Sequence, residues 1–290
     1  MHTLIIGAGF SGFQIALLAK QMGSVCGTRR SAESFDELHG AGIDAAVFSE
    51  TDVSENALQQ MASTTHLVIC AGPQRQAPLN DSVLRWFGSA AARLPQLQWV
   101  GYLSTIGVYG NHDGGWVDEN TPCTSIQTRS VMRLEAEQGW QKQAAHWQVP
   151  LSILRLSGIY GPGRNAVEDA IAGRARMLIK PDQVFNRIHV EDLATATMQA
   201  ARIGYAGIVN ITDDLPAPPQ DVIRHAHELV GKPAPLAVDF ETADISDMAR
   251  SFYSENKRVS NALSKQALNM NYRFPTYREG LAAALNAYTQ

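Results

Sequence analysis

The stretch HTLIIGAGFSG, from His2 to Gly12, decides the fold of this chain. An apolar run typical of a buried strand leads into the pattern Gly7-x-Gly9-x-x-Gly12, and a segment with helical apolar spacing follows and ends near Gly23. The three glycines permit a tight turn, the approach of a pyrophosphate to the backbone, and close packing of helix on strand. This strand–loop–helix context indicates a dinucleotide-binding site, with a purely structural glycine turn as the alternative.

Further candidate cofactor residues surround this loop. Phe10 and Ser11 open the expected helix, whose amino terminus would face the phosphates. The second expected strand ends in Thr28-Arg29-Arg30, where an NAD site usually has an acidic residue. Two guanidiniums in place of a carboxylate suit a 2′-phosphate, so we expect NADP as the cofactor, with NAD as the alternative. Alternatively, the two arginines have no ligand and are simply exposed to solvent after the end of the strand.

Six more strand-like runs follow, and helix-like segments separate several of them. The runs are SVCGTRR (24–30), IDAAVFS (43–49), THLVICAGP (65–73), LQWVGYLST (97–105), PLSILRLSGIYG (150–161) and GIVNITD (207–213). Apolar strands that alternate with helices imply a parallel sheet covered on both faces, in a doubly wound α/β architecture. We expect a Rossmann domain over 1–162 plus 187–215, and a small, mostly helical substrate lobe over 163–186 plus 216–290.

Composition narrows the function classes. The 290 residues suit one large domain or a domain with a smaller lobe, and the net charge of −4 gives no basic footprint for nucleic acid. Three widely spaced cysteines (Cys26, Cys70 and Cys123) suggest neither a disulfide framework nor a metal site. No apolar run reaches the ~20 residues of a membrane span. A strand that begins almost at Met1 leaves no room for a signal peptide, so we expect a cytoplasmic protein.

Later motifs occur in a characteristic order. They are LSTIGVYG (103–110), LRLSGIYGPGR (154–164), RIHVEDLA (187–194), GIVN (207–210), KRVSN (257–261) and YREGL (277–281). With the glycine loop, this ordered set resembles the extended short-chain dehydrogenase/reductase family, and more narrowly its NAD-dependent epimerase/dehydratase group. The resemblance implies a Rossmann domain with a carboxy-terminal substrate lobe. It also implies a nucleotide-sugar or a similar polar alcohol or ketone as substrate, and a homodimer.

The resemblance further implies three catalytic positions, namely a Ser or Thr after the fifth strand and a Tyr and Lys four residues apart on the next long helix. Thr105 corresponds to the hydroxyl residue, and Ser104 beside it is the alternative. Backbone capping at a strand end is the plain role for both. The Lys position falls on Arg133 and the Tyr position falls on Arg129, and no tyrosine occurs between Tyr109 and Tyr160 to restore the pattern.

An arginine cannot replace the tyrosine as a base. Deprotonation at pH 7 costs about 4 kcal/mol for tyrosine and roughly 7–9 kcal/mol for arginine. Arg133 can still hold the nicotinamide ribose as the family's Lys does, and Glu137 is the partner expected for it one helical turn further on. Ala71 and Gly72, at the end of the fourth expected strand, complete the predicted cofactor site.

Several other residues are weaker candidates for a catalytic or substrate-binding role. Tyr253 and Lys257 form a Y-x-x-x-K pattern in the lobe that we interpret as coincidence, whereas Lys257 and Arg258 are placed by resemblance to meet a substrate phosphate. Minor candidates for a proton carrier are Tyr109, Tyr160 and His112, and His189 is expected to start a helix and pack under the sheet edge.

Two hypotheses about the function follow. The chain is either an atypical NADP-using enzyme or a non-catalytic NADP(H)-binding protein, since fold does not fix function.

Overall fold

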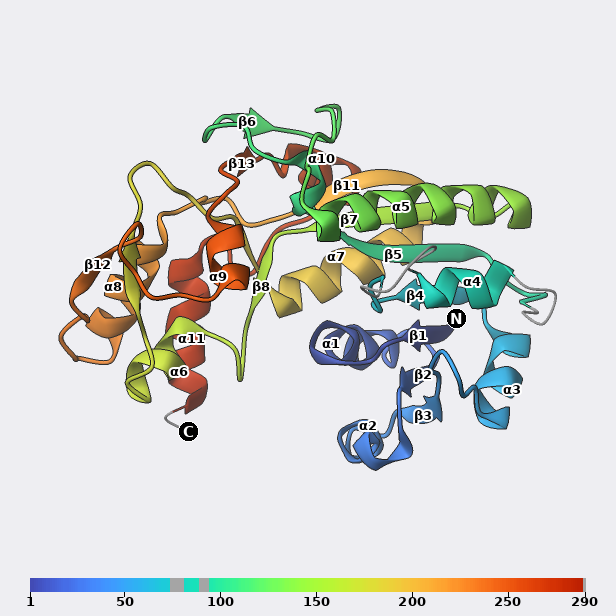
Figure 1. Ribbon diagram of the computed structural model, residues 1–290. Coiled ribbons are helices and arrows are strands. Elements are labelled where there is room, and N and C mark those ends of the chain that lie inside the picture. Colours follow the sequence, from blue (N-terminus) through green and yellow to red (C-terminus); the bar gives the residue numbers. More distant parts are fainter. Residues whose placement is uncertain (74–80, 89–93, 289–290) are drawn as a thin grey trace.

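The computed structural model describes residues 1–73, 81–88 and 94–288 (Figure 1). Seven parallel strands form one sheet in the order β3-β2-β1-β4-β5-β7-β11. Their bounds are β1 His2–Ile6, β2 Ser24–Arg29, β3 Asp44–Val47, β4 His66–Ile69, β5 Trp99–Thr105, β7 Leu151–Leu156 and β11 Gly207–Ile211. All seven lie within the expected strand runs, so the doubly wound α/β prediction is confirmed. The order reverses between β1 and β4, the point at which such sheets bind ligands.

Helices cover both faces of the sheet. One face carries α1 (Phe10–Ala19), α2 (Asp36–Gly40) and α7 (Val190–Ile203), and the other carries α3 (Glu55–Ser63), α4 (Ser82–Gly88) and α5 (Thr128–Trp147). Alternate residues of β1 enter the two cores, because Ile5 packs with the α1 and α7 side while Leu4 and Ile6 pack with the α5 side. Residues 89–93, which follow α4 in the sequence, lie outside the described residues.

Apart from η1, which directly precedes α2, the remaining elements gather beside the amino-terminal end of α5 (Figure 1). The helical ones are η1 (Ala32–Ser34) and η2 (Ile106–Tyr109) within the first part of the chain, and then α6 (Ala166–Ile171), α8 (Pro219–Leu229), α9 (Asp247–Phe252), α10 (Ala262–Ala267) and α11 (Tyr277–Tyr288). The short strands are β6 (Trp116–Val117), β8 (Gly158–Tyr160), β9 (Met177–Ile179), β10 (Arg187–His189), β12 (Ala237–Asp239) and β13 (Arg258–Val259), which pair as β8–β10, β9–β12 and β6–β13.

A separate apolar cluster joins α6, α8 and α11 through Val167, Val222 and Leu281. This cluster gives the smaller group of helices a core of its own. The division of the chain into a Rossmann domain and a substrate lobe at the expected boundaries stays a prediction. Across the described ranges, no helix is long and apolar enough to cross a membrane.

Candidate functional site

The glycine loop is fixed in shape by its neighbours. Gly7 has a φ of +88°, and a Cβ on it would lie 3.1 Å from the backbone nitrogen of Ala71. The Gly7 N–H donates to the hydroxyl of Thr28 (3.0 Å), and the Ala8 N–H donates to the Thr28 carbonyl (2.8 Å). Thr28 and Ala71, two predicted cofactor residues, therefore lie against the loop and hold it at the carboxyl edge of the sheet.

The amino terminus of α1 is open. A Cβ on Gly9 would meet no atom within 4 Å, whereas a Cβ on Gly12 would lie 2.6 Å from the Gly7 carbonyl oxygen. No side chain caps α1 and its first turn holds no acidic residue, whereas Ser54 caps α3 and Asn165 caps α6. Unsatisfied N–H groups at a helix start attract anions. The open space before Gly9, Phe10 and Ser11 therefore fits a dinucleotide pyrophosphate.

The two arginines after β2 differ in their surroundings. Arg29 forms an ion pair with Glu37 on α2 (2.5 Å), and its side chain is 18% exposed. Arg30 is exposed and has no carboxylate partner among the residues described. Sequence reasoning overlooked Glu37, because it is eight residues from Arg29 and reaches it only through the turn into α2. The assignment of both arginines to a 2′-phosphate stays a prediction.

A cleft of about 730 Å³ lies between the carboxyl edge of the sheet and the segments around residues 184–187 and 249–257. Its walls include Thr105, Gly107, Arg129, Arg133, Tyr160 and Lys257. Thr105 ends β5 and its hydroxyl accepts the Gly107 N–H (3.1 Å), so it caps η2 while it faces the cleft. The structure thus brings the predicted hydroxyl residue and both substituted arginines together in one concave site.

Ser104 is instead part of a buried ionic cluster. Its hydroxyl donates to the Glu137 carboxylate (2.5 Å), which also accepts two hydrogen bonds from Arg155 (3.1 and 2.8 Å). The prediction that Glu137 pairs with Arg133 is wrong, because Glu137 points under α5 toward β7, where Arg155 lies. The isolated arginine in the apolar run LSILRL was the signal in the sequence, since a charge in a buried strand requires a partner.

The two substituted arginines reach different partners. Arg133 donates to the Leu103 carbonyl (2.6 Å), and its Nη2 fills the space that a Cβ on Gly72 would need, 2.3 Å away. It therefore spans the ends of β5 and β4 within the predicted cofactor site. Arg129 is exposed at the cleft mouth and stacks on the ring of Phe252 from α9, with its guanidinium carbon 4.0 Å from the ring centre. Sequence reasoning did not find Phe252.

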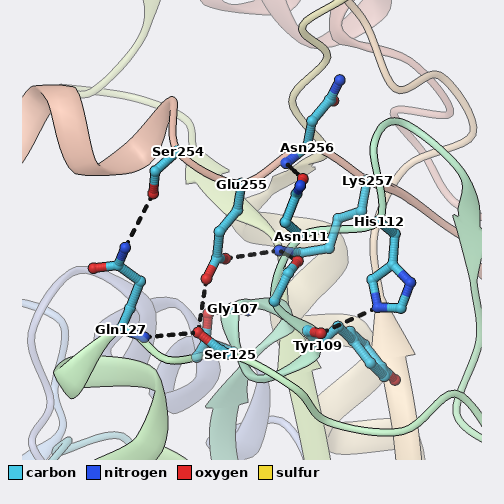
Figure 2. Close-up of polar contacts among 12 residues, drawn as sticks. Gly107, Tyr109, Asn111, His112, Ser125, Gln127, Ser254, Glu255, Asn256 and Lys257 are labelled. Carbon is cyan, nitrogen blue, oxygen red and sulfur yellow. Dashed lines mark hydrogen bonds and ion pairs between the residues drawn. The ribbon is translucent and has the colours of Figure 1, made fainter.

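Figure 2 shows how the segment after α9 is joined to the loops on either side of β6. Lys257 donates to the Gly110 carbonyl (2.6 Å) and pairs with Glu255 (2.9 Å), and Glu255 accepts a hydrogen bond from Ser125 (2.7 Å). Burial lowers the pKa of Lys257, and the Glu255 carboxylate partly offsets that change. Lys257 is therefore a cleft cation held by backbone and carboxylate.

The tyrosines near the cleft are poor proton carriers. Tyr109 donates to Asn210 (2.8 Å) beneath the cleft wall, and Tyr160 donates to the Thr276 carbonyl (3.4 Å). Tyr253 lines the cleft among aromatic neighbours. Burial raises the pKa of all three phenols, so each is harder to ionise at neutral pH than a free tyrosine.

Three other candidates do not line the cleft. His112 lies with its Nε2 3.1 Å from the Tyr109 carbonyl oxygen, and the Arg258 guanidinium donates to the Gly114 carbonyl. His189 caps α7, as expected, and burial lowers its pKa to about 4. Within the described parts of the chain, no cluster of His, Cys, Asp and Glu could hold a metal ion.

Comparison with known proteins finds several that are similar to this chain in sequence or in structure. No family model matches it. It is 28% identical over 215 residues to protein YeeZ of Escherichia coli K12, a match that covers 69% of this chain and 74% of YeeZ. It is 41% identical to a functionally unknown conserved protein from Silicibacter pomeroyi, whose structure matches 100% of this chain and 99% of that one with a TM-score of 0.87.

More distant structures share the fold. The UDP-glucuronic acid 4-epimerase of Bacillus cereus, solved with NAD, is 16% identical with a TM-score of 0.79 over 100% of this chain and 97% of the epimerase. The dTDP-glucose 4,6-dehydratase of Bacillus anthracis, also solved with NAD, is 17% identical with a TM-score of 0.77 over 100% and 96%. These two more distant structural neighbours are thus an epimerase and a dehydratase that were solved with NAD.

Proposed function

We propose that this chain, which belongs to the family of the Silicibacter pomeroyi protein, binds NADP at its glycine loop and transforms a nucleotide-sugar or similar polar alcohol or ketone. The observation that carries this proposal is that the uncapped start of α1, which follows β1, and the cleft at Thr105, which ends β5, both lie at the carboxyl edge of the parallel sheet. Its fold neighbours that act on nucleotide-sugars were solved with NAD. A bound nicotinamide would supply the hydride chemistry.

The residues of the chain take distinct roles in this proposal. Thr105 donates a hydrogen bond to the oxygen of the substrate, and Arg133 holds the nicotinamide ribose. Ser104 is unsuited to the same task because its hydroxyl is committed to Glu137. The usual tyrosine is replaced by Arg129, which can stabilise negative charge but cannot remove a proton at neutral pH. Any transfer of a proton therefore follows a route that differs from that of the family.

The alternative function is NADP(H) binding without turnover. It is favoured by the stack of Arg129 on Phe252 at the position of the missing tyrosine, and by the burial of the phenols that lie nearest. Under this alternative the cofactor site is kept and the chain reports redox state or binds a partner. The two functions agree on the cofactor and differ only in turnover.

The experiment compares cofactor affinity first and turnover second. Calorimetry with NADPH and NADH should show tighter binding of NADPH, and Arg30→Ala should lower that preference about tenfold, the size of a lost charge-assisted hydrogen bond. Glu37→Gln is the matched variant of opposite sign, because it removes the carboxylate beside Arg29 and should raise the preference. Equal responses of NADPH and NADH to both variants would refute the 2′-phosphate assignment.

Turnover is then measured on a panel of nucleotide-sugars by following the absorbance of the bound nicotinamide. Redox change with any member, lost in Thr105→Val, supports the enzyme. Tight NADPH binding with no redox change across the panel supports the non-catalytic function. Absence of binding of either dinucleotide would eliminate both functions.

A further inference from the structure

Arg187 lies where the cleft meets a second cavity. This second cavity, of about 440 Å³, lies among α6, α8 and α11. Much of its wall is apolar and comes from Ala166, Pro219, Val222, Ile223, Tyr277 and Leu281. Arg187, Tyr160 and Arg164 line both cavities, so these three side chains mark the boundary between them.

The guanidinium of Arg187 is hydrogen bonded to the protein through only one of its nitrogens among the described residues. Its Nη1 donates to the carbonyl oxygens of Phe185 (2.9 Å) and Ala217 (3.2 Å). Within residues 1–73, 81–88 and 94–288, no protein acceptor is hydrogen bonded to its Nε or Nη2, and no carboxylate forms an ion pair with it. Nε and Nη2 form the edge that binds an oxyanion through two parallel N–H bonds. Arg155 uses this same edge for Glu137.

The charge of Arg187 lacks a full counter-charge. Asp213 lies near enough to act on it, but this carboxyl is itself buried, and burial raises its pKa to about 8. Near neutral pH Asp213 is therefore largely protonated. Arg187 is half-buried, and a guanidinium withdrawn from water is costly unless a negative group pairs with it. A ligand that carries an oxyanion would supply that partner.

Arg164 adds a second guanidinium at the boundary. Its guanidinium carbon lies 5.7 Å from the ring centre of Phe10 in the glycine loop, and it forms no ion pair with any of the described carboxylates. Two guanidiniums match a group that carries about two negative charges better than a single carboxylate. A terminal phosphoryl group has that charge, and a bridging diphosphate has it as well, with one negative charge on each of its two phosphoryl groups.

We propose that Arg187 binds a phosphoryl group of the substrate at the boundary of the two cavities, with the far end of the same ligand in the smaller cavity. This inference rests on the proposed function, because it takes the larger cleft to be the substrate site. It adds a binding residue and a subsite between α6, α8 and α11. The reacting end of the ligand then lies toward Thr105 and the phosphoryl group lies midway along the ligand.

Two phosphate probes of different length test the site. Calorimetry at low ionic strength should show that pyrophosphate and uridine diphosphate bind the wild type. Arg187→Gln should weaken both about 10- to 100-fold, the range for hydrogen bonds to a charged group. Arg187→Lys should bind both phosphates more tightly than Arg187→Gln but less tightly than the wild type, because lysine keeps the positive charge but cannot form two parallel N–H bonds. Arg174→Gln is the matched control, since Arg174 lines the small cavity but pairs with Asp169 (2.9 Å).

Ile223→Trp tests the smaller cavity separately. Because it fills the cavity and leaves Arg187 in place, it should weaken uridine diphosphate and leave pyrophosphate unchanged. Equal affinity of wild type and Arg187→Gln, no binding of either phosphate at millimolar concentration, or tighter binding of malonate than of pyrophosphate would overturn the phosphoryl assignment. Unchanged uridine diphosphate affinity in Ile223→Trp would overturn the subsite. NADPH binding, measured in every variant, reports on the proposed function independently.

Discussion

Gly9 and Gly12 stand three residues apart in one loop, yet an added Cβ would meet different surroundings at each. At Gly12 the Cβ would lie 2.6 Å from the Gly7 carbonyl oxygen, which is backbone and cannot swing away. At Gly9 it would enter open space in front of α1. The fold itself therefore excludes a side chain at Gly12, whereas at Gly9 only a bound ligand would exclude one.

Substitution of each glycine by alanine should distinguish an effect on cofactor binding from an effect on folding stability. We expect Gly9→Ala to fold with wild-type stability and to lose NADPH affinity by at least about tenfold, because its Cβ occupies the space for the pyrophosphate. We expect Gly12→Ala to lose about 1–3 kcal/mol of unfolding free energy from overpacking. Urea unfolding and tryptophan quenching by NADPH measure the two quantities. Wild-type NADPH affinity in a folded Gly9→Ala would contradict the assignment of the loop.

At the scale of elements, β5, α5 and β7 are joined by one buried cluster. Ser104, Glu137 and Arg155 come from these three elements in turn, and the side chains of the two charged members are 2% and 4% exposed. The removal of one member of a buried ion pair leaves an uncompensated charge, which is more costly than the removal of both. The cluster therefore fixes α5, and with it Arg129 and Arg133, over the sheet.

Glu137→Ala should lower the free energy of unfolding by about 3–5 kcal/mol, the usual cost of breaking a buried pair. Replacing both partners, as in Glu137→Met with Arg155→Met, should recover much of that loss because neither charge remains unpaired. Glu135→Ala, on the exposed face of the same helix, is the control and should change stability by less than about 0.5 kcal/mol. Urea denaturation measures all three. A double variant as unstable as the single one would contradict this account.

The sequence predicted these elements better than their contacts. Apolar runs and the glycine loop carry local signals, so all seven strands of the sheet and the doubly wound architecture were predictable. The partner of Glu137 was not, because α5 exposes several faces and the sequence does not say which side chain of β7 lies below. Phe252 on Arg129 joins residues more than a hundred positions apart. The small cavity also arises only when α6, α8 and α11 pack together.

At the scale of the whole molecule, the cleft depends on contacts between distant parts of the chain. The stack of Arg129 on Phe252 ties α9 to α5. The bonds of Lys257 to Gly110 and of Glu255 to Ser125 tie the segment after α9 to the loops around β6 (Figure 2). The same fold supports epimerases and dehydratases, but a fold alone does not assign chemistry. The function therefore has to be tested on the groups that line the cleft, among them Thr105, Arg129 and Arg133.

Whole-molecule stability should also respond to pH through Asp213. In the folded state this carboxyl keeps its proton up to about pH 8, whereas in the unfolded chain it loses the proton near pH 3.9. Between these values the folded state holds the extra proton, so its stability falls as pH rises, by up to about 1.4 kcal/mol per pH unit. Below pH 6.5 His189, with its pKa lowered to about 4, contributes the opposite slope. The Asp213 contribution is therefore clearest above pH 6.5.

Asp213→Asn removes that titration while it keeps the shape of the side chain. Between pH 6.5 and pH 8, the stability of the wild type relative to Asp213→Asn should fall by about 1.5 kcal/mol, because only the wild type must give up a proton from a buried carboxyl. Urea unfolding at the two pH values measures this difference directly and cancels the titration of all other groups. Asp214→Asn, at the exposed neighbouring position, should show no such change. A constant difference between wild type and Asp213→Asn would mean that Asp213 is already ionised in the folded protein, and Arg187 would then have its counter-charge within the chain.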